Sequence, residues 1–503
     1  MTVQPFDMSG ITRDGAGVKH YDGLPDSLVA MLRASVSRDP GGEAVVELGG
    51  PRLTYRALWD RAARVAGGLR AGGVRPGDRV AVRLPNGVDW VLAFFGAQLA
   101  GAVAVPVNTR FTEEEARYVI DDSGASYVFA PGEALPDGEP YAADGQTRDD
   151  LAAIFYTSGT TGFPKGAMTS HENFLSNAET CVRCLDMDRG GGPELRTLIS
   201  VPLFHVTGCN SQLLPLLQLG GASVVMPGFE VEAFLSAIPG ERINVLTSVP
   251  AIYWLAMNQP AFAETDVSGV RWVAYGGAPI APDLVTKIKA RFPSSRVGNG
   301  FGLTETSSVA TFLPHEYAVA HADSVGFAAP VVDVRLEEPD PRTGVGELLI
   351  RGANVVSGYW GKPEATADTF VDRWLRSGDL ARIDEEGLTY VVDRAKDMIN
   401  RGGENVYCVE VENVLAAVPG VFEVAVLGVS DEMMGEKVGA VLVPAPGVSF
   451  DAAAALSYAR ERLADFKLPE YLHVRGEALP RNPGGKVLKP LLRKETVWEP
   501  ARR

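Results

Sequence analysis

Apolar and polar residues alternate with two different spacings over the first 130 residues of the chain. A stripe of apolar side chains from Leu58 to Leu69 follows Thr54, a residue type that caps helices, and predicts an amphipathic helix. The short apolar run at 79–82 then predicts a strand. The same order recurs in the next segments: a helix over 87–101, a strand over 103–105, a helix from Thr112 and a strand over 126–129. This alternation predicts an α/β fold with largely parallel sheets.

Later regions follow other patterns. Short stretches around 346–360 predict the strands and turns of a β-rich subdomain, and the order helix, strand, strand, helix after residue 408 predicts a small α+β unit. Residues 1–24 are expected to form an irregular tail. Residues 131–149, rich in Pro, Gly, Asp and Glu, are expected to form a solvated connection.

Length and composition narrow the class of protein. A chain of 503 residues exceeds the size of a single hydrophobic core, so several lobes are expected. Its 46% hydrophobic and 22% charged residues are typical of a protein that buries large cores. The net charge of −16 and the lack of a Lys/Arg cluster disfavour a nucleic-acid partner.

We expect that the protein is not exported. The first residues, Met1 to Asp7, have no basic or apolar region of a secretion signal, so we expect a cytoplasmic protein. The longest apolar run, 90–107, is explained better by a buried helix and a strand than by a membrane span. Four cysteines in so long a chain indicate a reducing compartment, and Cys181 and Cys184 form a lone C-x-x-C that we expect to pack in the core.

Hydroxyls, glycines and one lysine are concentrated at 156–166, directly after the apolar strand predicted at 151–155. Glycines let backbone N–H groups approach an anion, hydroxyls donate further hydrogen bonds, and Lys165 adds positive charge, a combination that suits a polyphosphate. The stretch is not a Walker A loop, because its lysine lies between Pro164 and Gly166. A surface linker rich in small residues is the alternative, and Pro164 and the preceding strand argue against it.

Further polar and glycine-rich motifs follow other predicted strands. Tyr-Gly-Gly-Ala-Pro at 275–279 and Gly-Phe-Gly-Leu-Thr-Glu-Thr at 300–306 each suit a tight turn, but as a pair they carry more weight. His205 ends a strand predicted at 197–205, at the edge where α/β sheets bind ligands, although a lone histidine is more often a core or rim residue. Asp379 could accept two hydrogen bonds from ribose hydroxyls, the alternative being a turn aspartate exposed to water.

Together these motifs resemble, in the same order, those of the adenylate-forming enzymes, which include acyl-CoA synthetases, adenylation domains of peptide synthetases and luciferases. The resemblance extends over about residues 25 to 495. It implies a large domain at 25–395, built from stacked αβαβα sheets and a β-rich subdomain, after the tail at 1–24. It also implies a small mobile α+β domain at 396–503 that rotates about Lys396.

The resemblance implies roles in a first reaction, in which ATP adenylates a carboxylic acid. Lys486, in the last motif, corresponds to the lysine that catalyses adenylation, Thr304 contacts the α-phosphate, and Glu305 and Thr160 hold Mg²⁺. Asp379 and Arg394 contact the ribose. The set implied to bind ATP or AMP is Thr157, Ser158, Gly159, Thr160, Thr161, Lys165, Gly276, Gly277, Ala278, Pro279, Gly300, Phe301, Gly302, Thr304, Asp379, Arg394 and Lys486.

The resemblance also implies where the acid and the thiol bind. His205 lines the entrance to the carboxylate site, and Gly402 and Gly403, flanked by Arg401 and Glu404, enter the active site for thioester formation with CoA. The implied acyl pocket consists of His205, Val206, Gly208, Cys209, Val249, Tyr253, Tyr275, Gly276, Gly302 and Leu303. Because this pocket contains no Arg or Lys, a second carboxylate would be buried unpaired. We therefore expect a monocarboxylic acid, first a fatty acid and alternatively an aryl acid.

Two alternative functions are considered, and two residues differ from the family's usual motifs. The phosphopantetheine of a carrier protein could accept the acyl group in place of CoA, although the chain has no fused carrier domain. A non-catalytic binder of nucleotides or acyl-adenylates is a different class, against which Lys486, Glu305, Asp379 and Arg394 argue. Ser377 stands where the family usually has Thr, and Cys408 stands where Pro is common, a change expected to loosen the start of the following helix.

Overall fold

The computed structural model describes residues 3–157, 164–278, 280–402, 404–445, 447–448, 450–481 and 487–501. Its internal contacts divide the chain into two compact units. The first unit comprises Met1–Val334, Ile350–Arg376 and Glu385–Thr389, and the second comprises Arg335–Leu349, Ser377–Asp384 and Tyr390–Arg503. Both units mix helices with sheets, and the predicted α/β class with a smaller α+β C-terminal part is confirmed.

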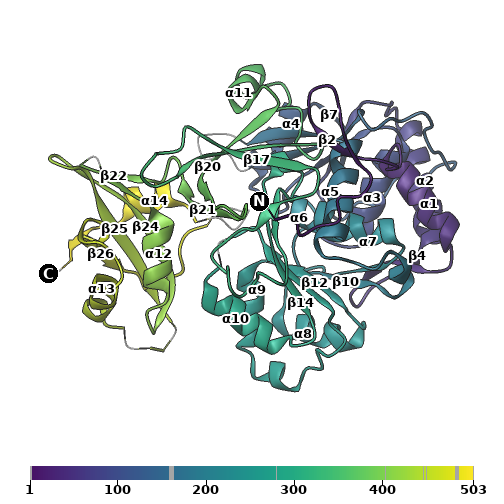
Figure 1. Ribbon diagram of the computed structural model, residues 1–503. Coiled ribbons are helices and arrows are strands. Elements are labelled where there is room, and N and C mark those ends of the chain that lie inside the picture. The colour runs from purple at the N-terminus through teal and green to yellow at the C-terminus, as the bar shows by residue number, and fades with distance from the viewer. Residues whose placement is uncertain are drawn as a thin grey trace. The chain divides into compact units, whose positions relative to one another are not determined.

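The first unit contains a nine-stranded sheet (Figure 1). Its order is β16-β15-β14-β13-β12-β10-β11-β3-β4, and its middle strands pair in parallel while the strands at both edges pair antiparallel. The bounds are β3 Glu43–Glu47, β4 Arg52–Thr54, β10 Arg196–Ile199, β11 Ala222–Val225, β12 Val245–Ser248, β13 Trp272–Gly276, β14 Arg296–Phe301, β15 Thr311–Leu313 and β16 Phe327–Ala328. The parallel middle places the carboxyl ends of β10, β12, β13 and β14 at one edge.

The first unit also contains a five-stranded sheet, ordered β7-β5-β6-β8-β9. Its strands are β5 Arg79–Val82, β6 Val103–Pro106, β7 Ala125–Phe129, β8 Leu151–Thr157 and β9 Lys165–Ser170. The first four pair in parallel, and β8 and β9 form an antiparallel pair in which Thr157 lies opposite Lys165. The strand predicted before the hydroxyl-rich stretch is therefore present as β8.

Helices cover these sheets as the apolar periodicity predicts. α2 begins at Tyr55, directly after its cap Thr54, and packs closely on α3, since a Cβ on Gly96 would lie 2.4 Å from Val65 Cγ1. α3 is buried along its length, and no helix in the described ranges is long and apolar enough to cross a membrane. The helices of this unit are α1 Leu28–Arg38, α2 Tyr55–Ala71, α3 Val88–Leu99, α4 Glu113–Ser123, α5 His171–Cys184, α6 Val206–Gly208, α7 Leu214–Leu219, α8 Val231–Gly240, α9 Pro250–Met257, α10 Pro282–Arg291 and α11 Pro363–Thr369.

The N-terminal segment, expected to be irregular, contains a hairpin of β1 (Ile11–Arg13) and β2 (Lys19–Tyr21). Asp333 anchors it by accepting from Arg13 at 2.8 Å and from Lys19 at 3.0 Å. These short strands carry few apolar residues, so periodicity gave no sign of them. Their partner lies more than 300 positions away along the chain.

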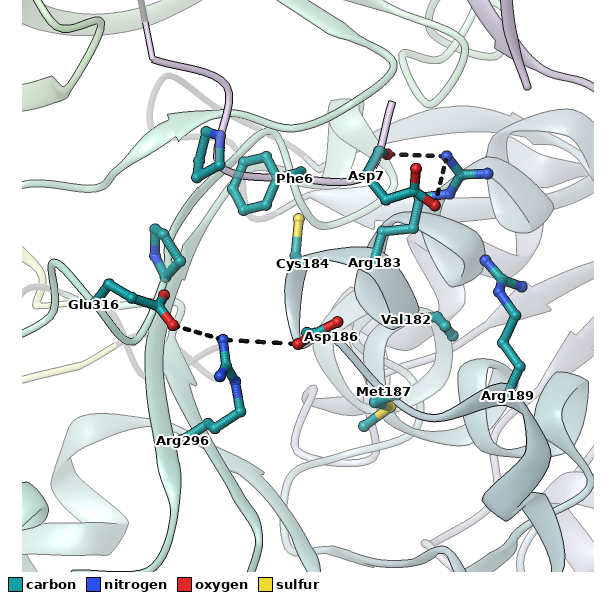
Figure 2. Close-up of a pocket in the computed structure, with 12 residues that line it drawn as sticks. Phe6, Asp7, Val182, Arg183, Cys184, Asp186, Met187, Arg189, Arg296 and Glu316 are labelled. Atoms are coloured by element: carbon teal, nitrogen blue, oxygen red, sulfur yellow. Dashed lines mark hydrogen bonds and ion pairs between the residues drawn. The ribbon is translucent and has the colours of Figure 1, made fainter. Parts of the chain in front are cut away.

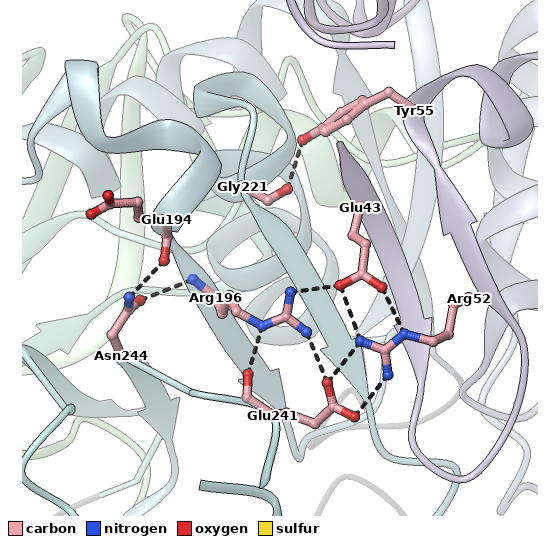
Figure 3. A network of polar contacts seen from close by, with 8 residues as sticks. All are labelled: Glu43, Arg52, Tyr55, Glu194, Arg196, Gly221, Glu241 and Asn244. Atoms are coloured by element: carbon pink, nitrogen blue, oxygen red, sulfur yellow. Dashed lines mark hydrogen bonds and ion pairs between the residues drawn. The ribbon is translucent and has the colours of Figure 1, made fainter. Parts of the chain in front are cut away.

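An ion-pair network links β10, β3 and β4 of the nine-stranded sheet (Figure 3). Arg196 on β10 is buried and bonds Glu43 on β3 and Glu241 at the end of α8, each at 2.8 Å. Arg52 on β4 bonds the same two carboxylates, at 2.6 Å and 2.8 Å. Hydrogen bonds from Arg52 and then Arg196 lower the pKa of Glu43 to about 2 despite its burial.

The second unit is built on a sheet ordered β23-β22-β25-β26-β27, with β24 pairing β25. Its strands are β22 Ile399–Arg401, β23 Glu404–Val406, β24 Val421–Asp431, β25 Gly435–Pro444, β26 Tyr471–Val474 and β27 Glu499–Pro500, and its helices are α12 Cys408–Ala416, α13 Ala452–Arg460 and α14 Lys489–Glu495. The division between the units crosses β17 Val332–Glu337, β18 Gly346–Gly352, β20 Trp374–Ile383 and β21 Thr389–Arg394, whereas β19 Phe370–Val371 lies within the first unit.

α12 begins at Cys408, the position at which a looser helix start is expected. Cys408 is fully buried, its backbone N–H donates to Asp393 Oδ2, and its thiol donates to the Asp397 carbonyl at 3.0 Å. A proline at this position would lack both donors. The substitution therefore ties the first turn of α12 to the segment 393–397.

Candidate nucleotide and acyl site

Four adjacent strand ends gather most of the predicted acyl residues of the first unit. β10, β12, β13 and β14 are parallel neighbours, and His205, Val249, Gly277 and Gly302 follow their carboxyl ends. A Cβ on Gly277 would lie 3.8 Å from Val249 Cγ1 and 3.9 Å from Thr207 Oγ1, so the three segments are in contact distance. This edge is where open α/β sheets bind ligands.

His205 ends the loop after β10 and caps the short helix α6. Its Nδ1 accepts from the Thr207 N–H at 3.2 Å and lies 3.2 Å from Thr207 Oγ1. These two contacts hold the imidazole against Thr207, whose Oγ1 would lie 3.9 Å from a Cβ on Gly277. Five of the other predicted acyl residues are buried, namely Val206, Gly208, Cys209, Tyr253 and Tyr275, whereas Val249, Gly276, Gly302 and Leu303 are partly exposed. The Tyr253 hydroxyl donates to the Ala274 carbonyl at 2.8 Å.

The two glycine motifs lie side by side, as their pairing in the sequence suggested. Gly276 and Gly300 are register partners on β13 and β14, and a Cβ on Gly276 would lie only 2.1 Å from Gly300 O. A Cβ on Gly302 would lie 1.4 Å from Ser308 O. Neither position has room for a side chain, so backbone forms the surface of the site at these strand ends.

Glu305 is held in a 3-10 turn, η4 (Thr304–Thr306), directly after this backbone surface. Its carbonyl accepts from the Val356 N–H at 2.9 Å, and its Oε1 accepts from the Tyr359 hydroxyl at 2.7 Å. A partly exposed carboxylate suits Mg²⁺, which uses one or two carboxylates together with phosphate and water oxygens. Within the described ranges no group of three or more His, Cys, Asp or Glu side chains is placed to hold a metal.

The buried side-chain amides of Asn354 and Asn210 stabilise this turn by hydrogen bonds to backbone carbonyls. Asn354 Nδ2 donates to the carbonyls of Thr306 at 2.9 Å and Val309 at 2.7 Å, and Asn210 Nδ2 donates to Ser307 O at 3.0 Å. Ser307 has a φ of 53° and Ser308 a φ of 120°, conformations that cost energy in residues other than glycine. The amides therefore hold a strained backbone directly after Glu305.

Lys165 and Tyr359 form the other described side of this region. The Lys165 ammonium group lies 4.8 Å from the centre of the Tyr359 ring, within the range of a cation–π interaction. Sequence reasoning missed Tyr359 as a site residue, although the motif Gly-Tyr-Trp at 358–360 was visible as a turn. The predicted phosphate-binding residues Ser158, Gly159, Thr160 and Thr161, and Pro279 of the first glycine motif, lie outside the described residues.

The second unit brings together the two residues predicted to bind ribose. Arg394 Nε lies 2.6 Å from Asp379 Oδ1, and the Asp379 side chain is 3% exposed. The Ser377 hydroxyl accepts from the Asp379 N–H at 3.1 Å and donates to Leu348 O at 2.6 Å, so the serine that replaces the usual threonine retains a fixed hydroxyl.

The predicted thiol-side residues of this unit lie on and beside β22. Arg401 Nε donates to Glu470 at 2.7 Å, Gly402 adopts a φ of 61°, and Glu404 is exposed. Lys396 lies in a turn after β21. Gly403 and Lys486 lie outside the described residues.

A pocket of about 390 Å³ lies apart from these residues, between the N-terminal segment and the end of α5 (Figure 2). Three arginines line it, but acidic groups engage each of them: Arg183 pairs with Glu179, Arg189 also bonds Glu179, and Arg296 lies 2.9 Å from Glu316. None of the predicted site residues lines this pocket. The acidic and basic side chains that line the pocket balance one another, so this pocket does not indicate a binding site for an anion.

Two family models match the chain. The model described as AMP-binding enzyme covers residues 32–360, and the one described as AMP-binding enzyme C-terminal domain covers residues 410–486. The chain belongs to the AMP-binding enzyme family. The prediction of an adenylate-forming enzyme of the acyl-CoA synthetase class is confirmed.

Named relatives and solved structures agree with this class. The chain is 39% identical over 473 residues to feruloyl-CoA synthase of an Amycolatopsis species, covering 89% of this chain and 95% of that one. It is 37% identical over 499 residues to the long-chain-fatty-acid–CoA ligase FadD13 of Mycobacterium tuberculosis, covering 92% and 97%. The o-succinylbenzoate-CoA synthetase of Bacillus subtilis with its acyl-adenylate intermediate superposes with a TM-score of 0.84 at 29% identity, covering 93% and 99%. The same enzyme has been solved with ATP and a magnesium ion, with a TM-score of 0.82 at 29% identity, covering 92% and 98%.

Proposed function

We propose that this protein joins a monocarboxylic acid to CoA through an acyl-AMP intermediate, with release of pyrophosphate. The observation that carries the proposal is the convergence of His205, Val249, Gly277 and Gly302 at four adjacent strand ends, next to the turn that holds Glu305. An uncharged, backbone-lined surface suits the acid, and the carboxylate turn suits a magnesium–nucleotide complex.

The chemistry needs the negative charge of two reactants to be balanced and the acid to be aligned with the α-phosphorus. In this proposal Lys165, with the stretch 157–165, binds the outer phosphates, and Thr304 contacts the α-phosphate. Glu305, with Thr160, would hold Mg²⁺, which when bound neutralises charge that develops on the phosphates. His205 positions the acid at the entrance of its pocket.

Residues of the second unit have their own proposed roles. Asp379 and Arg394, which already form a close pair, bind the ribose hydroxyls. Lys486 stabilises the transition state of adenylation. Lys396 is the hinge of a rotation that exchanges Lys486 for the segment 401–404, which then borders the CoA arm.

The acid is proposed to be a fatty acid, with an aryl acid as second candidate. The predicted pocket residues are uncharged, which disfavours a second carboxylate on the substrate. The aryl candidate is favoured by one specific observation, because the relative named feruloyl-CoA synthase is at least as similar to this chain as the relative named for long-chain fatty acids.

The test is pyrophosphate release from ATP on a panel of fatty acids, hydroxycinnamic acids and dicarboxylic acids, with and without CoA. We expect release with one class of monocarboxylic acid, CoA-dependent thioester formation, and no reaction with dicarboxylic acids. Lys486→Ala should slow adenylation at least ~10²–10³-fold, as loss of a single oxyanion donor does.

Each outcome of this assay separates one alternative. Adenylate formation without transfer to CoA, but with transfer to a phosphopantetheine carrier protein, would assign the enzyme to carrier loading. Binding of ATP without turnover of any acid would indicate a non-catalytic binder and would refute the proposal.

A further inference from the structure

We propose that Tyr359 is a positioning residue for the phosphate side of the site: its hydroxyl orients the Glu305 carboxylate, and its ring holds the Lys165 ammonium group. The inference rests on the proposed function and assigns Tyr359 a role within it. The hydroxyl lies 2.7 Å from Glu305 Oε1, and the ring centre lies 4.8 Å from Lys165 Nζ. One side chain thus contacts two groups that are 140 positions apart in the sequence.

The backbone of Tyr359 is fixed to the strand that carries Lys165. The segment 358–360 runs antiparallel to β9, with a bridge between Tyr359 and Ala167. The Met168 N–H donates to Gly358 O at 3.0 Å, and the Trp360 N–H donates to Gly166 O at 2.8 Å. The position of the ring relative to Lys165 therefore depends on sheet hydrogen bonds.

The same segment is also fixed to the turn that carries Glu305. The Val356 N–H donates to Glu305 O at 2.9 Å, three residues before Tyr359. The Tyr359 side chain is largely buried and packs edge-on against Phe370, with ring centres 5.6 Å apart. A buried ring held at both backbone neighbours has little freedom to turn away from the carboxylate.

The phenol is the donor in its bond to Glu305. An ionised carboxylate can only accept, so the Tyr359 hydroxyl supplies the proton of this 2.7 Å bond. A neutral donor fixes the direction of a carboxylate without cancelling its charge. An arginine or lysine in this place would compete with a divalent cation, and among the described residues none pairs with Glu305.

Tyr359 also contacts Lys165 without neutralising its charge. An aromatic face attracts an ammonium group without neutralising it, so the lysine stays available for a phosphate oxygen. Within the described ranges no carboxylate forms an ion pair with Lys165. Tyr359 therefore places both a cation and an anion for the nucleotide while adding no charge of its own.

The test compares Tyr359→Phe, which retains the ring and loses the hydroxyl, with Tyr359→Met, which loses both. Pyrophosphate release is measured while Mg²⁺, ATP and the acid are varied in turn. For Tyr359→Phe we expect the Mg²⁺ concentration for half-maximal rate to rise on the order of 10-fold or more, as for other groups that orient a metal ligand, while KM for the acid stays within about twofold. Tyr359→Met should add a rise of about two- to fivefold in KM for ATP, the value of an exposed cation–π contact.

Tyr55→Phe is the matched control. Tyr55 is also buried, and its hydroxyl donates to Gly221 O at 2.7 Å, far from any predicted site residue in sequence. It should lose a similar amount of stability in urea with no change in Mg²⁺ dependence. A Tyr359→Phe enzyme with unchanged Mg²⁺ dependence would overturn the proposal, as would equal rises in the constants for Mg²⁺ and the acid. If the unaltered protein releases no pyrophosphate with any acid, the proposed function is refuted and the role of Tyr359 with it.

Discussion

The buried amide cluster below Glu305 makes a prediction that can be worked out from the structure. Asn354 is fully buried, and its Nδ2 supplies the hydrogen bonds that the Thr306 and Val309 carbonyls accept. Asn354→Leu retains the number and branching of the side-chain heavy atoms and removes both donors. The change leaves two carbonyl groups facing an apolar side chain.

The magnitude follows from the cost of unsatisfied buried groups. Each costs about 1–3 kcal/mol, so rigid loss of both bonds would destabilise the first unit by about 2–6 kcal/mol. The backbone conformations of Ser307 and Ser308 store about 1–3 kcal/mol each, part of which is released once the turn relaxes. We therefore expect a net loss of about 3 kcal/mol. Relaxation moves Glu305 out of its turn, so adenylation should fall at least ~10-fold under conditions where the variant is still folded.

Urea denaturation followed by tryptophan fluorescence measures the loss of stability. Pyrophosphate release at a urea concentration well below the unfolding transition measures the loss of adenylation rate. Asn258→Leu is the control, because this exposed amide donates to Trp254 O at 2.8 Å and should cost less than about 0.5 kcal/mol. Ser307→Gly in the Asn354→Leu background should lower the stability no further. The reasoning fails if Asn354→Leu loses less than about 1 kcal/mol, or if it loses stability while keeping full activity.

Two further predictions concern pH and the ion-pair network. Burial lowers the pKa of His171 to about 4, whereas the unfolded chain binds that proton near pH 6.5, so stability should fall by up to about 3 kcal/mol between pH 6.5 and 4. His171→Asn should make urea midpoints less dependent on pH in that range, and an unchanged dependence would contradict the assignment. Arg196→Met should cost about 3 kcal/mol at pH 7, because Glu43 and Glu241 would then share Arg52 alone. That difference should narrow between pH 4.5 and 2 as Glu43 protonates, and a constant difference would contradict it.

The sequence by itself determined the elements whose signals are local. The stripe from Leu58 to Leu69 after Thr54 predicted α2, and the apolar run at 151–155 predicted the strand before the hydroxyl-rich stretch. The order of motifs predicted the family, which the comparisons confirm. These features depend on spacing within one or two turns of chain, so one sequence contains them in full. The assignment of individual residues to ATP, acid and CoA remains a prediction.

Only the tertiary structure decided which distant polar residues meet. The hairpin at 11–21 depends on Asp333, and Asn354 acts on carbonyls that precede it by more than forty positions. The sequence predicts Tyr359 only as a turn residue, whereas the structure places it in contact with Glu305 and Lys165. A hydrogen bond depends on direction and distance in space. The spacing of polar residues along the sequence does not indicate which remote residue each one contacts. Apolar burial is encoded in local spacing, whereas the polar contacts of this site exist only once the strands are assembled.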